Sequence, residues 1–186
     1  LLQPPYGIRD ADGMSARVIG QPEQIEAALA RVAAAPWRLP PQAHPGARTG
    51  APTLLAVGAL GGSAIAADLT EGLYRDRLPH PLVVVRDYHW PAFVTRESLA
   101  LLCSYSGDTE ETLALYLEAG ERRVPRVAIT TGGTLGAWCA RDGVPCALVP
   151  GGAPPRAALF SSWVTLTSLL HALGWVDDPA PAWREA

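Results

Sequence analysis

From Thr53 onward the chain alternates short apolar runs with longer segments of helical composition. The short runs have the length of β-strands, at 53–57, 82–85, 99–103, 127–130 and 147–149. The segments between and after them are typical of helices, at 63–73, 109–119, 135–141 and about 156–173. Such alternation is typical of parallel strands covered by helices, and run 82–85 lacks the in/out alternation of a strand with one exposed face. The pattern predicts an α/β fold, a three-layer αβα sandwich with a five-stranded, mostly parallel sheet.

The first 52 residues differ in composition and pattern from the rest of the chain. Residues 3–20 are polar and rich in turn-forming residues, and apolar side chains then recur three and four apart over 22–33, which predicts an amphipathic helix with Pro22 in its first turn. Residues 36–52 hold five prolines and two glycines, so they cannot continue a helix or form a regular ladder of hydrogen bonds. We expect residues 1–52 to form an N-terminal helix and a proline-rich wrap around a domain at 53–175. The two prolines of 176–186, with no periodicity, predict the start of a linker to a second domain.

Composition excludes several classes of function. All 15 basic residues are arginines, which excludes a Schiff-base lysine and the lysine of a phosphate-binding loop. The net charge of −3 and scattered charges provide no basic stripe for nucleic acid, and no apolar run approaches the ~20 residues that cross a bilayer. Three cysteines without a CxxC spacing favour neither a disulfide framework nor a zinc site, so we expect a reducing, cytoplasmic setting.

Ligands of parallel α/β sheets bind at the carboxyl ends of the strands. The first strand is followed by Gly58, Gly61, Gly62 and Ser63, whose spacing differs from the GxGxxG pattern of dinucleotide-binding proteins. After the third strand, four hydroxyl residues surround Gly107 at the expected start of a helix: Ser104, Ser106, Thr109 and Thr112. Such hydroxyls, with the free amides and positive dipole end of the helix, could form an uncharged phosphate cradle. The alternative is an ordinary capping box, with Thr109 as the helix cap.

Similar sequences end the next two strands, Thr130-Thr131-Gly132-Gly133-Thr134 after the fourth and a segment ending in Pro155-Arg156 after the fifth. Taken in chain order, these two segments resemble the SIS (sugar isomerase) domain, together with Gly61-Gly62-Ser63 and the run 104–112. The N-terminal residues 10–14 and 22–24, run 85–88 and the Pro-Arg pair resemble more narrowly the N-terminal SIS domain of the bifunctional phosphoglucose/phosphomannose isomerases. The resemblance covers nearly the whole chain and implies a flavodoxin-like fold.

The resemblance also implies an activity, the aldose-ketose isomerisation of glucose 6-phosphate or mannose 6-phosphate to fructose 6-phosphate, with no metal or cofactor. It implies that Arg156 faces the C1/C2 end of the sugar, where its cationic fork stabilises an enediolate oxygen. The residues implied to bind a hexose 6-phosphate are Ser104, Ser106 and Thr109 at the phosphate and Gly61, Gly62 and Ser63 along the sugar.

The chain departs from the family in one respect. Family members have two SIS domains, and the glutamate that acts as base and the ring-opening histidine come from the region after the first domain. We therefore assign neither role to a residue of this chain, and we expect it to be the phosphosugar-binding half of an isomerase. The alternative is a non-catalytic SIS module that senses a phosphosugar, whereas a purely structural dimerisation domain would leave the clustered hydroxyls unexplained. The long apolar last helix predicts a homodimer.

Several residues also have simple structural interpretations. Without the resemblance, Arg156 would be a solvated charge at the start of the last helix. Cys103 is expected to be a small buried apolar residue at a strand end, Trp90 an indole packed in a turn before Pro91, and His171 a core or interface histidine.

Overall fold

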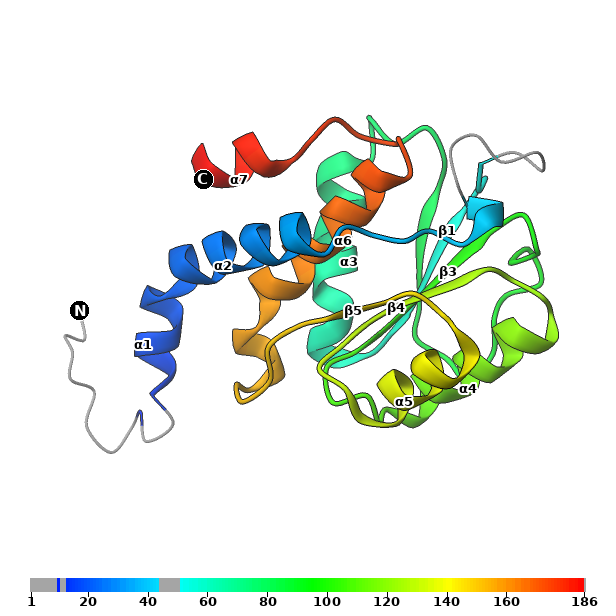
Figure 1. Cartoon of the computed structure of the whole chain (residues 1–186), viewed down its shortest axis with the longest axis horizontal. Coiled ribbons are helices and arrows are strands. Elements are labelled where there is room, and N and C mark those ends of the chain that lie inside the picture. The colour runs from blue at the N-terminus through cyan, green and yellow to red at the C-terminus, as the bar shows by residue number, and fades with distance from the viewer. Residues whose placement is uncertain (1–9, 11–12, 44–50, 186) are drawn as a thin grey trace.

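The computed structural model describes residues 10, 13–43 and 51–185 of the chain (Figure 1). Its centre is a five-stranded sheet in the order β2-β1-β3-β4-β5, in which every pair of neighbouring strands is parallel. This is the strand order of flavodoxin-like sheets. The predicted strands are confirmed to within two residues: β1 is Leu55–Ala59, β2 Leu82–Val85, β3 Leu99–Ser104, β4 Arg126–Thr130 and β5 Cys146–Leu148.

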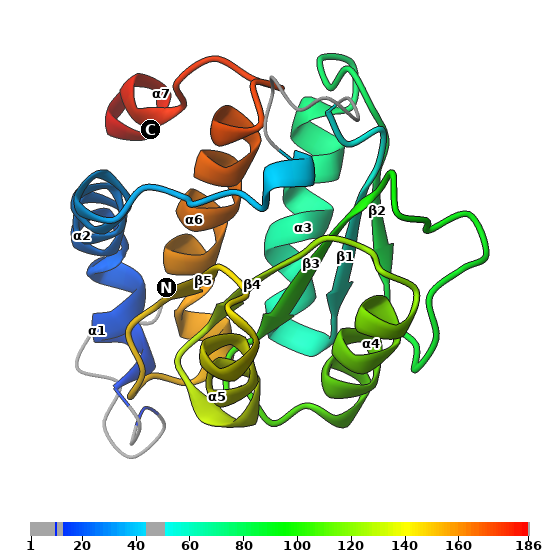
Figure 2. The ribbon, with the colours of Figure 1, turned by 45° about the vertical axis from the view of Figure 1, so that its right-hand side comes forward.

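Helices cover both faces of the sheet, as predicted (Figure 2). One face carries α4 (Glu110–Glu121) and α5 (Gly133–Asp142), and the other carries α3 (Gly61–Tyr74) and α6 (Leu159–Ala172). Each face has its own hydrophobic core. Leu101 packs with the α3 and α6 side, and its neighbour Leu102 packs with the α4 and α5 side. All residues of β1 and β3 are buried, because both faces of these central strands are covered.

The N-terminal part adds two helices, one beside α6 and a shorter one that contacts the first. Helix α2 (Gln21–Ala34) has a proline in its first turn, as predicted, and buries Ile25, Ala28 and Leu29 against the α6 side. Helix α1 (Met14–Ile19) was not predicted, since residues 3–20 look polar and turn-rich. The Asp10 carboxylate accepts hydrogen bonds from the N–H groups of Met14 at 2.6 Å and Ser15 at 3.0 Å. Two amides in the first turn of α1 therefore have acceptors.

The described part of the proline-rich wrap contains only a 3₁₀ turn, η2 (Pro41–Ala43), which agrees with the expectation of irregular backbone. The Trp37 indole donates to the Ser168 hydroxyl at 3.1 Å and to the Thr165 carbonyl at 3.2 Å. These bonds attach the wrap to α6. Residues 44–50, which the prediction also placed in the wrap, lie outside the described residues.

The C-terminal segment, expected to be the start of a linker, contains a helix that the sequence analysis did not predict. Residues Ala180–Glu185 form helix α7, which lies beside α2 (Figure 1). Its Trp183 ring packs edge-on against Trp163, with centroids 4.8 Å apart, and its Nε1–H donates to the Thr167 hydroxyl at 3.0 Å. Asp178 accepts the Ala180 N–H at 3.0 Å at the helix start, where prolines are tolerated. The helix was missed because one turn and a half is too short to show a periodic pattern.

Helix α6 is apolar for a reason other than the predicted dimer contact. It lies between α2 and α3 and against the sheet, and half of its 14 residues are buried there. The 3₁₀ turn η3 (Pro155–Ala157) precedes it. None of the helices in the described part of the chain is long and apolar enough to cross a membrane.

Candidate functional site

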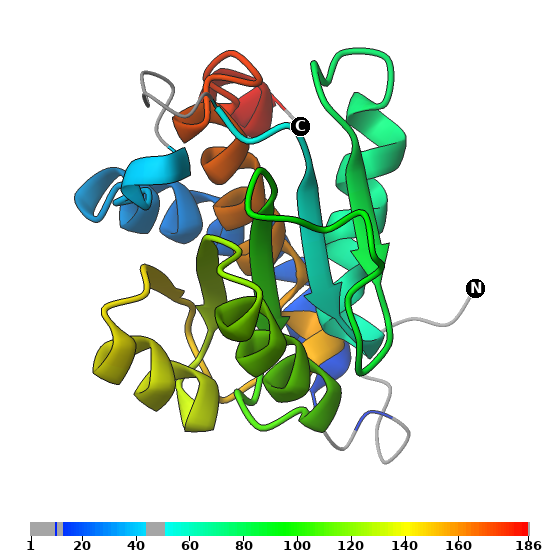
Figure 3. The same ribbon diagram turned by 90° about the vertical axis from the view of Figure 1, so that its right-hand side faces the viewer.

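The predicted site residues lie at the carboxyl edge of the sheet, where the parallel strands end side by side (Figure 3). Ser104 is the last residue of β3, and Ser106 and Thr109 follow in the connection to α4. Gly61, Gly62 and Ser63 form the first turn of α3 directly after β1. The topology therefore brings together two loops that are about 40 residues apart in the sequence.

Two of the predicted phosphate ligands are in direct contact. Ser104 is 1% exposed, and its Oγ lies 2.8 Å from Thr109 Oγ1. Ser104 Oγ also accepts the Gly107 N–H at 3.1 Å, which closes the loop over the strand end. Ser106 is exposed, and its Oγ accepts the Asp108 N–H at 3.2 Å. As an acceptor of that bond, the Ser106 hydroxyl retains its own proton to donate outward.

The capping alternative for Thr109 is not what the structure shows. Thr109 occupies the N-cap position of α4 in extended geometry, but no side-chain cap hydrogen bond is formed there, because its hydroxyl faces Ser104. The first backbone bond across the helix start is from the Leu113 N–H to the Thr109 carbonyl, at 3.0 Å. The preceding amides of the first turn are thus left for an external acceptor, at the positive end of the helix dipole. This arrangement suits an anion.

Acidic residues border the same turn. Glu110 is exposed and Glu111 is partly exposed, both in the first turn of α4. The phenol of Tyr88, in the loop after β2, lies against them, and the charge of Glu111 is the main cause of the raised pKa of Tyr88. The rim of the cradle on this side is therefore negative.

The loops after β3 and β4 touch backbone to backbone. A Cβ on Gly107 would lie 2.0 Å from the Gly132 carbonyl oxygen, and one on Gly133 would lie 2.3 Å from the Ser106 carbonyl oxygen. Both glycines also have positive φ, +80° and +62°. Any side chain at either position would push the loops apart, so the two glycines set the shape of this edge.

Asp108 links the same two loops. Its Oδ1 accepts the N–H of Thr134 in the first turn of α5 at 3.0 Å, and contact with Thr134 lowers the pKa of its carboxyl. The side chain therefore caps α5.

Tyr105 is a site residue that the sequence analysis missed. Its N–H donates to Ser63 Oγ at 3.1 Å, and its carbonyl accepts the Thr131 hydroxyl at 2.8 Å. Its phenol donates to the Pro150 carbonyl and accepts the Ala153 N–H, both at 3.2 Å. One residue therefore connects the loops after β1, β3, β4 and β5. The available signal was an aromatic residue between the two serines of the hydroxyl loop.

Arg156 lies at the margin of this edge. The ideal Cβ position of Gly62 is 3.4 Å from the backbone N of Arg156 and the carbonyl carbon of Pro155, so η3 packs directly on the start of α3. A Cβ at position 62 would lie in van der Waals contact with η3. The Arg156 side chain is exposed, and no ion pair joins it to another described residue.

Sequence comparison finds relatives among isomerases, although no protein-family model matches the chain. The bifunctional phosphoglucose/phosphomannose isomerase of Caldicellulosiruptor bescii is 42% identical over 118 residues, which cover 63% of this chain and 35% of that enzyme. The enzyme of the same name from Pyrobaculum aerophilum is 40% identical over 123 residues, 66% of this chain and 37% of that enzyme. The chain is an SIS domain related to these isomerases. It spans about a third of the length of these relatives.

Solved structures agree on the fold of the SIS domain. The tagatose-6-phosphate ketose/aldose isomerase of Escherichia coli superposes with a TM-score of 0.69, covering 92% of this chain and 50% of that one. At 16% identity, this likeness shows the fold alone.

Cys103, at the end of β3, is buried as predicted, and burial raises the pKa of its thiol to about 12. Trp90 is also buried as predicted, and its Nε1–H donates to the Leu115 carbonyl at 2.8 Å. His171 is exposed at the end of α6, and its Nδ1 lies 3.2 Å from the Val176 carbonyl, so the prediction of a core position is wrong. The described residues include no cluster of three or more histidine, cysteine or acidic side chains arranged to hold a metal ion.

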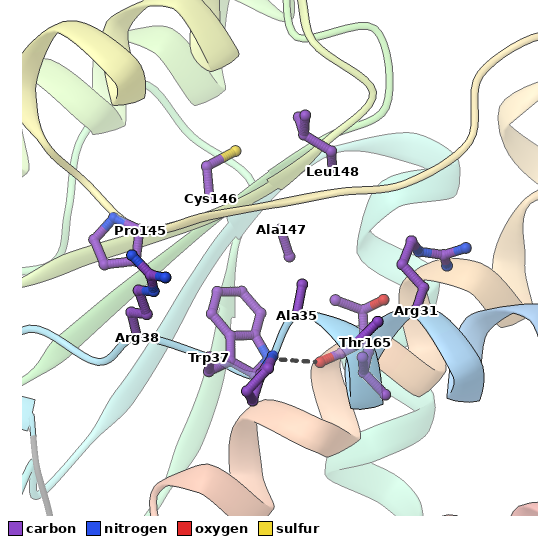
Figure 4. Close-up of a pocket in the computed structure, with 12 residues that line it drawn as sticks. Arg31, Ala35, Trp37, Arg38, Pro145, Cys146, Ala147, Leu148 and Thr165 are labelled. Carbon is purple, nitrogen blue, oxygen red and sulfur yellow. Dashed lines mark hydrogen bonds between the residues drawn. The ribbon is translucent and has the colours of Figure 1, made fainter.

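A cavity of about 650 Å³ lies away from the hydroxyl loops of the SIS domain (Figure 4). It opens between β5, at the free edge of the sheet, and the segment from Arg31 to Arg38, with Thr165 of α6 at its base. The hydroxyl groups and free amides suited to an anion therefore lie at the carboxyl edge of the sheet, and this cavity is separate from them.

Proposed function

We propose that this chain binds a hexose 6-phosphate and is the phosphosugar-binding part of an isomerase. The phosphate would accept hydrogen bonds from Ser106, from whichever of Ser104 and Thr109 does not donate to the other, and from the first-turn amides of α4. The observation that carries this proposal is the contact between Thr109 and Ser104, since it leaves the start of α4 without a side-chain cap. No lysine is required, which agrees with a chain that has none.

We further propose the reaction, isomerisation of glucose 6-phosphate and mannose 6-phosphate to fructose 6-phosphate. A carboxylate moves a proton between C2 and C1 after the ring has opened, and negative charge develops on the sugar oxygens. Arg156 would stabilise that charge with its guanidinium, and Gly61, Gly62 and Ser63 would line the sugar. The supporting observations are the names of the relatives and the position of the Arg156 backbone beside Gly62.

The base is proposed to come from outside this chain. Among the described acids nearest the cradle, Asp108 is occupied as the cap of α5. This same observation favours a second candidate, a module that binds a phosphosugar without converting it. We propose that the chain corresponds to the N-terminal SIS domain of a longer enzyme, with residues 1–52 as its N-terminal wrap and a second domain following 176–186.

Binding is tested by thermal unfolding with fructose 6-phosphate. We expect a rise in Tm that disappears in Ser106→Ala, because bound ligand stabilises the folded state. Thr53→Ala is the matched control: its exposed hydroxyl precedes β1 at the opposite edge of the sheet, so the rise should remain. No rise in the unmodified chain at millimolar ligand would contradict both candidate functions.

Catalysis is tested by a coupled assay of glucose 6-phosphate conversion, first on this chain and then on a longer chain containing the second domain. We expect the short chain to be nearly inactive and the longer one active. Turnover by the short chain would show that the base lies within it. Inactivity of both, with binding retained, would favour the sensing module.

We also propose a cytoplasmic, homodimeric protein. Its three cysteines are free thiols in the structure, as suits a reducing compartment. Since α6 is covered within the chain, the dimer contact is proposed on α3, where Ile65, Leu69 and Leu73 are 41%, 39% and 57% exposed at a spacing of four residues. Leu69→Glu should shift the sedimenting species from dimer to monomer, and a wild-type monomer would refute the dimer.

A further inference from the structure

The charged side chains that line the cavity beside β5 are all basic. They are Arg31, in the last turn of α2, and Arg38, in the proline-rich wrap, and none of the described aspartates and glutamates lines this cavity. Figure 4 shows the two arginines on opposite sides of the Trp37 ring. Most of the remaining lining is apolar and includes Val32, Pro36, Trp37, Pro145, Ala147 and Leu148. In a chain with a net charge of −3, this lining is a local exception.

The guanidinium of Arg31 has no counter-charge among the described residues. Its Nη2 is buried there without a hydrogen-bond partner, and none of the ion pairs between described residues includes Arg31. Burial lowers the pKa of this guanidinium, but an arginine stays protonated at neutral pH, so the desolvated charge remains. The dipole of α2 favours a cation at this end of the helix, yet it gives the buried nitrogen no acceptor.

The sequence around Arg31 prevents an ion pair along α2. The neighbours of a helical side chain are three and four positions away, and here these positions, 27, 28, 34 and 35, all hold alanine. Glu26 is the nearest acidic residue in the sequence, and its carboxylate lies 3.9 Å from the Arg184 guanidinium. A partner for Arg31 must therefore come from another element or from a ligand, and the elements that line the cavity provide no described acid.

We propose that this cavity binds a small organic anion with an apolar body, and that the anionic group of the ligand pairs with Arg31. The volume of about 650 Å³ lies within the range of small-molecule sites. A guanidinium shares its charge over three nitrogens, so an anion at any accessible nitrogen offsets the cost of burying the other. Trp37 and the two prolines provide apolar surface for the body of the ligand, and Arg38 adds a second positive charge across the ring.

The ligand of this cavity differs in class from the hexose 6-phosphate proposed for the hydroxyl loops. The hydroxyl groups of a sugar need hydrogen-bond partners when they are buried. Thr165 provides the only side-chain hydroxyl among the described lining residues, and it already donates to the Ser161 carbonyl at 2.6 Å. The two sites are therefore expected to bind different molecules, and each can be tested without the other.

The test uses 1-anilinonaphthalene-8-sulfonate, an anionic dye with a flat apolar body, and its uncharged analogue N-phenyl-1-naphthylamine. In fluorescence titrations the analogue should bind at least about tenfold more weakly than the dye, because it has no group to pair with Arg31. In the ¹H–¹⁵N spectrum, the dye should shift the indole signal of Trp37 and the amide signals of Cys146 and Leu148, which line the cavity. Fructose 6-phosphate should not displace the dye.

A variant isolates the contribution of the charge. Arg31→Gln should weaken binding of the dye by about tenfold and leave binding of the analogue unchanged, since only the charged contact is lost. The matched control is Arg77→Gln, at an exposed arginine that precedes β2 at the opposite edge of the sheet. This control should bind both molecules as the unmodified chain does.

Three results with unmodified protein would overturn the proposal, so the test does not depend on whether a variant folds. The first is no binding of the dye, or equal affinity for the dye and its analogue. The second is a set of shifted signals confined to the exposed α3 residues Ile65, Leu69 and Leu73. The third is loss of dye binding in a longer chain that contains the second domain, because that domain would then fill the cavity.

Discussion

The phenol of Tyr105 accepts the backbone N–H of Ala153 at 3.2 Å and donates to the Pro150 carbonyl at the same distance. Tyr105 belongs to the hydroxyl loop after β3, whereas Ala153 belongs to the connection that leads to Arg156. The hydrogen bonds of one side chain therefore hold the segment carrying the proposed catalytic arginine against the proposed phosphate cradle.

Replacing Tyr105 with phenylalanine should loosen that connection. The ring remains, but two hydrogen bonds to exposed or half-exposed backbone are lost, which should lower the free energy of unfolding by about 1 kcal/mol. Hydrogen exchange of the Ala153 amide should become faster. If exchange over 150–156 is the same in both proteins, the phenol does not restrain this segment.

Gly107→Ala should be strongly destabilising. The added Cβ would lie 2.0 Å from the Gly132 carbonyl oxygen, and the residue has φ +80°. Because steric overlap adds to backbone strain, the free energy of unfolding measured in urea should fall by more than about 3 kcal/mol. The matched control is Gly143→Ala, at φ +65° but with no atom within 4 Å of the new Cβ. The free energy of unfolding of this control should fall by only about 1 kcal/mol. Equal losses in the two variants would mean that backbone conformation alone decides, without contact between the loops.

Asp108 should contribute a pH-dependent part of stability. Its hydrogen bonds to Thr134 lower its pKa below the ordinary value of 3.8, so the folded state binds this proton more weakly than the unfolded state. The contribution is present above the ordinary pKa and is lost as pH falls through the lowered one. Asp108→Asn keeps a side-chain oxygen but does not titrate. The difference in free energy of unfolding between this variant and the wild type at neutral pH should therefore become smaller below about pH 4. A difference that stays constant down to pH 2 would show that the carboxyl does not titrate abnormally.

Trp183→Ala should detach α7 from the rest of the chain. The indole packs against Trp163 and Phe160 and donates to Thr167 at 3.0 Å, so its loss should lower the free energy of unfolding by about 2 kcal/mol. Limited proteolysis after Arg184 should also become faster. Trp183→Phe keeps an aromatic ring and should lose about 1 kcal/mol, the value of the hydrogen bond. Unchanged proteolysis in Trp183→Ala would mean that the indole does not hold α7.

The strands were predictable because their apolar runs reflect burial on both faces, which is a local property of the sequence. Run 99–103 became β3 with one more residue, and run 82–85 became β2 without change. Helices α1 and α7 were not predictable in the same way. Each has six residues, and their starts depend on single side-chain acceptors, Asp10 and Asp178, that no periodicity records.

The candidate site was predictable in composition but not in connectivity. Hydroxyls and glycines after successive strands indicated one edge, because parallel strands end together. The sequence could not distinguish a capping Thr109 from one that faces Ser104, since both begin a helix with the same residues. Nor could it assign Tyr105, whose partners Ser63, Thr131 and Ala153 lie 26 to 48 positions away.

The sequence by itself therefore determined the layer architecture, the edge that carries the hydroxyl loops and the absence of lysine chemistry, because these follow from residue type and local order. Only the tertiary structure decided which hydroxyl groups face each other and that α6 is covered by its own chain. Those facts depend on contacts between segments that come close only after the sheet has assembled and its loops have packed against one another.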